Sequence, residues 1–64
     1  MLPRDPFILL SYLNTQLRDE YSSLEEFCRS TGESMEDIVE AMRKIGYAYD
    51  PEGNRFARGQ ITAR

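Results

Sequence analysis

Residues 23–47 read Ser-Leu-Glu-Glu-Phe-Cys-Arg-Ser-Thr-Gly-Glu-Ser-Met-Glu-Asp-Ile-Val-Glu-Ala-Met-Arg-Lys-Ile-Gly-Tyr. Two stretches with apolar residues at helical spacing are separated by Gly32, which is the spacing of a helix-turn-helix. Many repressors use this arrangement to place the second helix in a DNA groove. Glu33 departs from the pattern, in which an apolar residue follows the turn glycine. The stretch therefore predicts two helices joined by a tight turn.

Both predicted helices carry signals for where they begin and end. Ser23 and Glu26 have capping-box spacing, and Gly32 can adopt the left-handed conformation that ends a helix. Ser34 is a good N-cap for the second helix, and Gly46 ends it. The residues expected on the apolar face of the first helix are Leu24, Phe27, Cys28 and Thr31. Those expected on the buried face of the second are Met35, Ile38, Val39, Met42 and Ile45.

Another helix is predicted before this pair. Asp5 can cap the free amides of its first turn, and Pro6 suits the first helical position because proline has no amide to leave unpaired. The helix is expected to run to about Glu20. Asn14 lies at the edge of its buried side and therefore needs a hydrogen-bond partner. The predicted buried stripe is Leu10, Leu13 and Leu17, flanked by Phe7, Leu9 and Tyr21.

After Gly46 the apolar spacing changes from helical to alternating. Residues 47–49 and 55–57 flank Asp50-Pro51-Glu52-Gly53-Asn54, whose proline and glycine fit a type I turn followed by a left-handed residue. This predicts a short hairpin that packs on the helices. The expected fold is mainly α, a three-helix core with a helix-turn-helix-like pair and a short C-terminal β-hairpin. Residues 1–57 are expected to form one domain, and 58–64 a mobile tail.

The composition argues against an enzyme or a metalloprotein. A chain of 64 residues buries only ~60% of the surface that it exposes when unfolded, which leaves little material for a substrate cleft. It has no histidine and one cysteine, so a zinc site would depend on carboxylates alone, which zinc seldom uses. Adjacent acids such as Glu36 and Asp37 point about 100° apart on a helix and do not form catalytic pairs. We expect no cofactor and no catalysis.

The lone cysteine, Cys28, cannot form an internal disulfide, which indicates a reducing compartment. The apolar run at 7–10 is too short to span a bilayer and lacks the basic start of a secretory signal. Met1 at the start is consistent with a complete small protein. We therefore expect a cytoplasmic protein.

Nucleic-acid binding is the less favoured of two functions. The candidate contacts on the second helix-turn-helix helix are Ser34, Met35, Arg43 and Lys44. The acidic Glu36 and Glu40 share the outer side of that helix, and residues 19–37 contain seven acids against one basic residue. Binding to a polyphosphate depends on cations, so this charge disfavours it.

The favoured function is a protein-interaction module without catalysis. Ile8 and Tyr12 are spaced i, i+4 on the side of the first helix opposite Leu13 and Leu17, so their side chains meet. Either the hairpin or the tail covers them, or a protein partner does. With Phe7 at its margin, this surface is the predicted partner-binding site, and a homodimer centred on Ile8 and Tyr12 is one form of it. No small-molecule substrate or membrane contact is indicated.

Two parts of the chain carry a family resemblance. The first part is Leu2-Pro3-Arg4-Asp5-Pro6-Phe7-Ile8-Leu9-Leu10-Ser11-Tyr12-Leu13-Asn14, followed by Leu17-Arg18-Asp19 and Tyr21-Ser22-Ser23-Leu24. The second part is Ile45-Gly46-Tyr47-Ala48-Tyr49-Asp50, followed by Asn54-Arg55-Phe56. Over about residues 2–56 the chain resembles the short bacterial proteins of domain-of-unknown-function family 4250. The resemblance implies a bacterial cytoplasmic protein. It implies no activity and no functional residues, because the family has none assigned.

Overall fold

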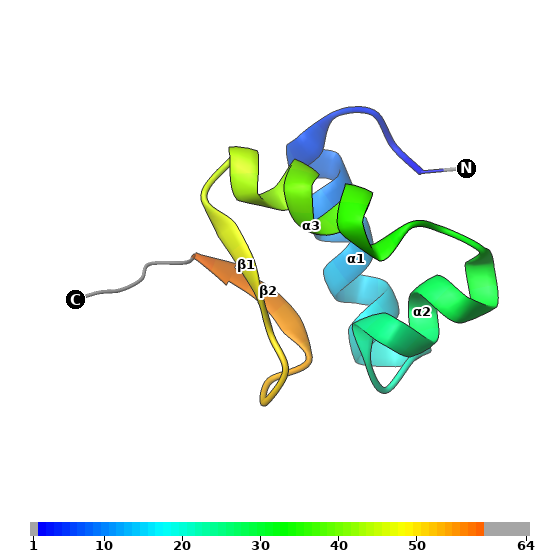
Figure 1. Ribbon diagram of the computed structural model, residues 1–64. Coiled ribbons are helices and arrows are strands. Elements are labelled where there is room, and N and C mark those ends of the chain that lie inside the picture. Colours follow the sequence, from blue (N-terminus) through cyan, green and yellow to red (C-terminus); the bar gives the residue numbers. More distant parts are fainter. Residues whose placement is uncertain (1, 59–64) are drawn as a thin grey trace.

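The computed structural model describes residues 2–58 as three helices followed by a hairpin. The elements are α1 (Pro6–Asp19), α2 (Leu24–Thr31), α3 (Met35–Lys44), β1 (Tyr47–Asp50) and β2 (Arg55–Arg58). In Figure 1, α3 crosses in front of α1, α2 lies beside the C-terminal end of α1, and the hairpin stands on the other side of α1. The predicted mainly helical fold with a C-terminal hairpin is confirmed.

The helices begin and end at the predicted capping residues. The Asp5 carboxylate accepts hydrogen bonds from the backbone amides of Phe7 and Ile8 at 2.8 and 3.2 Å. Ser23 and Ser34 cap α2 and α3 in the same way. Gly32 follows α2 with φ +79°, a left-handed conformation that glycine adopts without strain. These capping contacts are all local, within one turn of each helix end.

The core draws on every helix and on β2. Its buried members are Leu9, Leu13, Leu17, Leu24, Phe27, Cys28, Ile38, Met42 and Phe56. Half-buried apolar side chains pack around it, among them Tyr21, whose ring meets Phe27 edge-on with centroids 5.3 Å apart. The central residues of the three predicted stripes are therefore buried as expected.

The stripe of α1 is rotated from the predicted one. Leu9 is buried together with Leu13 and Leu17, whereas Leu10 is half-buried. Phe7, predicted to flank the stripe, has 60% of its surface exposed. Phe56 of the hairpin is hydrogen-bonded to Asn14, whereas Phe7 lies about two helical turns earlier on α1.

The buried face of α3 is narrower than predicted. Ile38 and Met42 are buried and Ile45 is half-buried, but Met35 and Val39 are each more than a third exposed. At 100° per residue these two lie about 60° to one side of the Ile38–Met42 row, beyond the edge of the core. Thr31 of α2 is also exposed, and its hydroxyl donates to the Phe27 carbonyl at 2.8 Å.

The hairpin pairs β1 and β2 antiparallel, with Tyr49 opposite Phe56 and Ala48 opposite Ala57. The left-handed residue of its loop is Asn54, with φ +52°. Asparagine tolerates this conformation, and its side chain is used there for hydrogen bonds described below. Arg58 ends β2, one residue beyond the predicted end of the domain. The rest of the predicted tail, 59–64, lies outside the described residues.

Candidate functional site

Asn14 joins the middle of α1 to β2. Its side-chain amide donates to the Phe56 carbonyl at 3.1 Å, and its side-chain oxygen accepts from the Phe56 amide at 2.7 Å. The side chain thus pairs with the outer edge of β2 as a neighbouring strand would. This is the partner that the half-buried position of Asn14 required.

Asn54 joins the hairpin loop to the end of α1. Its side-chain amide donates to the carbonyls of Leu17 and Tyr21, both at 2.9 Å. Its side-chain oxygen accepts from the Tyr49 hydroxyl at 2.7 Å, and that hydroxyl accepts from the Leu24 amide at 3.1 Å. One connected network therefore satisfies carbonyls at the end of α1 and an amide at the start of α2. Sequence reasoning missed both Asn54 and Tyr49, and the only available signal was an asparagine at the end of a four-residue loop.

An open groove runs between α1 and the hairpin loop. Its lining includes Leu10, Ser11, Thr15, Arg18 and Arg55 together with the two asparagines. The asparagine amides are committed to the backbone, and the Arg18 guanidinium pairs with Asp19 at 2.9 Å. The polar side chains of the groove therefore hold α1 and the hairpin together. Among the residues that line it, no nucleophile is hydrogen-bonded to a general base.

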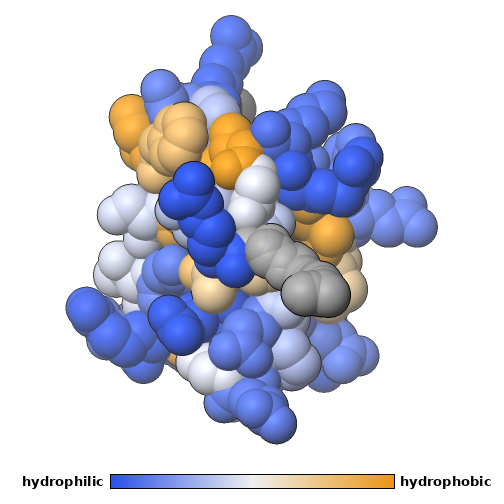
Figure 2. Space-filling model, turned by 90° about the vertical axis from the view of Figure 1, so that its left-hand side faces the viewer, coloured by the Kyte–Doolittle hydropathy of each residue, from blue (hydrophilic) through white to orange (hydrophobic). Residues whose placement is uncertain are grey.

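The predicted partner-binding residues begin α1. Phe7 and Ile8 are 60% and 59% exposed, and Tyr12 is 37% exposed. The Tyr12 ring meets Phe27 nearly at right angles, with centroids 6.4 Å apart, so part of it belongs to the α1–α2 contact. Figure 2 shows apolar side chains gathered at the upper end of the hairpin side, the end at which α1 begins and α3 finishes.

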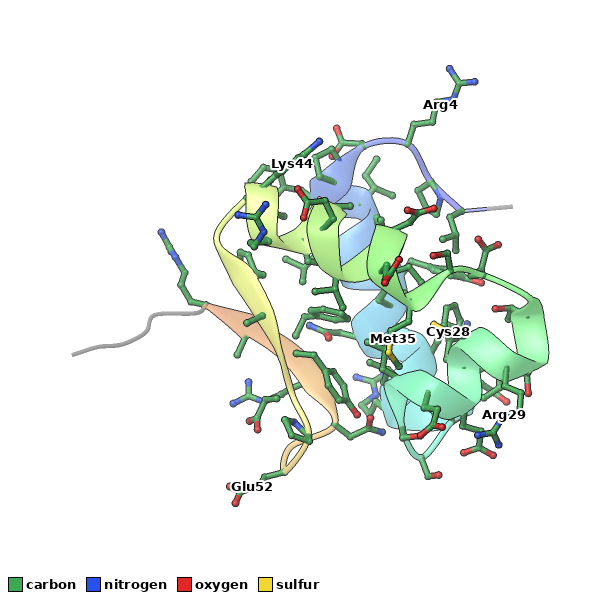
Figure 3. The ribbon with its side chains drawn as sticks, in the orientation of Figure 1. Arg4, Cys28, Arg29, Met35, Lys44 and Glu52 are labelled. Carbon is green, nitrogen blue, oxygen red and sulfur yellow. The ribbon has the colours of Figure 1, made fainter. Side chains whose placement is uncertain are left out.

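The four candidate nucleic-acid contacts are spread along α3. The Ser34 hydroxyl accepts from the Asp37 amide at 3.3 Å, and the Arg43 guanidinium pairs with Glu40 at 2.7 Å. Lys44 and Met35 lie at opposite ends of the helix, as Figure 3 shows. The outer side of α3 has a shallow depression in which the exposed Met35 and Val39 lie beside three carboxylates, those of Glu36, Asp37 and Glu40. The outer face of α3 is thus acidic and partly apolar.

Local contacts shift the pKa values of several groups. Hydrogen bonds from the Ser22 hydroxyl and amide lower the pKa of the Glu26 carboxyl, and a hydrogen bond from Arg18 lowers that of Asp19. Burial, and then the charge of Glu33, raise the pKa of the Cys28 thiol. Cys28 is therefore a protonated core residue at neutral pH and a poor nucleophile.

Within residues 2–58, no three side chains of the types that bind metals come close enough to share an ion. None of the helices in the described part has the length and apolarity needed to cross a membrane.

Comparison with known proteins places the chain in a family. No curated protein and no solved structure matches it. The family described as "Domain of unknown function (DUF4250)" matches residues 3–56, which takes in all three helices, the loop of the hairpin and the first half of β2. The protein is therefore a member of the DUF4250 family.

Proposed function

We propose that this protein is a non-catalytic interaction module that binds another protein through the first turns of α1. The observation that carries the proposal is the exposure of Phe7 and Ile8, each about 60%, on a domain whose hairpin packs elsewhere. Large apolar side chains that stay exposed beside each other are typical of contact sites. The lone buried cysteine supports a cytoplasmic location.

A different protein is favoured over a symmetric dimer at this surface. A dimer centred on Ile8 and Tyr12 would need both side chains free to meet their symmetry mates. The Tyr12 ring is already partly used against Phe27. That leaves Phe7 and Ile8, which lie about 100° apart around the helix and fit a partner that wraps its first turn.

The test is affinity capture from the native host with the Phe7→Glu, Ile8→Glu double variant. Glutamate in a first helical turn is favourable, so α1 is expected to form in the variant. The control is Thr15→Glu, which adds an acid at an exposed position of the same helix. A partner held by the wild type and the control and lost from the double variant, then reconstituted from purified components, supports the proposal. Equal capture by all three proteins, or a folded wild-type dimer that the double variant converts to monomer, argues against it.

The alternative is a divergent helix-turn-helix protein that binds nucleic acid. The observation in its favour is architectural, since α2 and α3 are joined by the left-handed Gly32 and followed by a hairpin like a small wing. The acidic outer face of α3 weighs against it.

A further inference from the structure

The two edges of the hairpin differ in how their backbone is satisfied. The outward amide and carbonyl of Phe56 in β2 bond to Asn14, which closes that edge against α1. Because the backbone amide and carbonyl of Phe56 point away from β1, those of Tyr49, which lies opposite it, must point away from β2. The same alternation applies to Tyr47, which lies two residues earlier, opposite Arg58.

The outer edge of β1 is therefore open. Among residues 2–58, no hydrogen bond from outside the β1–β2 ladder reaches the backbone amide or carbonyl of Tyr47 or Tyr49. The side-chain contacts of Tyr49 are made by its hydroxyl. In Figure 1, β1 lies on the viewer's side of β2, and no other element passes in front of it. Edge strands are usually protected from pairing by their shortness, a charge, a proline or a bulge. β1 is four residues long and ends in Asp50, but its Tyr-Ala-Tyr stretch carries no charge, proline or bulge.

We propose that β1 pairs antiparallel with β1 of a second copy, with Ala48 on the two-fold axis. In this register Tyr47 faces Tyr49 of the other copy, and each such pair can exchange both hydrogen bonds. Centring the pairing on Tyr49 would place Tyr47 opposite Pro51, which has no amide. Centring it on Tyr47 would place Tyr49 opposite Ile45, which caps α3.

The side chains fit this register. Tyr47 and Tyr49 pack against the core, and the Tyr49 hydroxyl is held by Leu24 and Asn54, so the strand presents its edge in a fixed orientation. Ala48 is exposed and small enough to face its own symmetry mate. Asp50 falls opposite Gly46 of the second copy, so no like charges meet across the axis.

The first test is disulfide trapping in a Cys28→Ala background. Ala48 forms a non-hydrogen-bonded pair with itself, where Cα atoms lie about 4.5 Å apart, within the range that a disulfide accepts. Ala48→Cys is expected to yield cross-linked dimer, whereas its control Ala57→Cys on β2 should not, because the two β1 strands would separate the Ala57 residues beyond disulfide range. Equal cross-linking of the two variants would overturn the proposal.

The second test needs no cysteine. Ala48→Lys places like charges opposite each other on the axis, whereas Ala57→Lys adds the same charge one strand away. Sedimentation of the wild type over rising concentration should show a dimer that Ala48→Lys abolishes and Ala57→Lys keeps. A wild type that remains monomeric throughout, or equal loss in both folded variants, would reject the β1 dimer. The Phe7→Glu, Ile8→Glu variant should still dimerise, so this inference and the proposed partner surface fail independently.

Discussion

Leu13 has no exposed surface and stands midway along the buried row of α1 between Leu9 and Leu17. Leu13→Ala is expected to cost about 2–5 kcal/mol because it leaves a cavity among packed side chains. A domain of this size has only a few kcal/mol of stability, so the variant should be largely unfolded at room temperature. Thermal melting followed by circular dichroism checks this, with the exposed Thr15→Ala as the control. A melt close to that of the wild type would mean that α1 does not pack through Leu13.

Asn54 permits a second prediction about one side chain. Asn54→Gly keeps the left-handed backbone but removes hydrogen bonds to Leu17, Tyr21 and the Tyr49 hydroxyl. Glycine is the better residue for this conformation, so backbone preference alone would make the variant more stable. We expect a loss of about 1–3 kcal/mol instead, measured by urea unfolding, because two part-buried carbonyls lose their donor.

Asn54→Ala separates the two contributions. It loses the same hydrogen bonds and also places a Cβ in a left-handed backbone, so it should be less stable than Asn54→Gly by about 1 kcal/mol. If Asn54→Gly is more stable than the wild type, the backbone preference outweighs the side-chain hydrogen bonds and the expected loss is wrong.

For single residues, the sequence predicts which side chains face the core, but it does not predict how far the core extends to either side of them. Periodicity identifies Leu13, Phe27 and Met42 as central to their faces, because the centre of an apolar stripe turns inward in any packing. It gave the wrong environment for Met35, which lies at a stripe margin. Whether a margin is covered depends on how far a neighbouring element extends, and that is a property of the assembled fold.

Among the elements, α2 is the shortest helix and depends most on its cap. The Ser23 hydroxyl accepts from the Glu26 amide at 3.0 Å, and the Glu26 carboxylate accepts from the Ser22 amide and hydroxyl. These hydrogen bonds to the charged form lower the pKa of Glu26 from its ordinary value of 4.5. A lowered pKa means that their stabilisation is complete above pH 4.5 and is lost as pH falls through the folded-state pKa.

Glu26→Gln should therefore melt at a lower temperature than the wild type at pH 7, and the two should converge as pH falls well below 4.5. Calorimetry across that range makes the comparison. The control is Glu25→Gln, which removes a charge from the same turn and loses only the exposed pair with Arg29. A constant difference between Glu26→Gln and the wild type at every pH would show that the carboxylate charge is not involved.

Element boundaries were predictable because their causes are local. Asp5, Ser23, Ser34 and the glycines act within one helical turn, and each occupies its expected place. The position of the hairpin was not predictable, because it depends on Asn14 meeting a residue 42 positions away. No pattern within either segment records that contact.

For the molecule as a whole, charge distribution favours one of the two proposed functions over the other. The outer face of α3 carries Glu36, Asp37 and Glu40, and its cation Arg43 is paired with one of them. We expect no binding to random duplex DNA at micromolar protein in about 50 mM salt, measured by fluorescence anisotropy. Binding by the wild type that weakens steeply with added salt would favour the nucleic-acid alternative.

The double variant Glu36→Lys, Glu40→Lys is the matched positive control. It reverses two charges and releases Arg43 from its ion pair while leaving the buried face of α3 intact. Salt-sensitive binding should appear in this variant, because the cations then face outward from one helix. If neither protein binds, the α2–α3 pair does not present α3 to a groove at all.

The candidate surfaces could be predicted from the sequence only in part. Ile8 was predicted to lie on the side of α1 opposite Leu13 and Leu17, and it is exposed. The open edge of β1 could not be predicted, since it follows from the backbone amide of Phe56 pointing toward Asn14. A sequence pattern shows which residues alternate along a strand, but not which edge of the strand is already occupied.

The contact between Asn14 and Phe56 also makes two adjacent amides exchange deuterium by different routes. The Phe56 amide donates to a side chain of α1, so solvent reaches it whenever the hairpin lifts from the helix. The Ala57 amide faces Ala48 across the ladder and exchanges only when the strands separate. The ratio of their protection factors thus measures how often the hairpin detaches intact, a motion that leaves secondary structure unchanged and escapes circular dichroism.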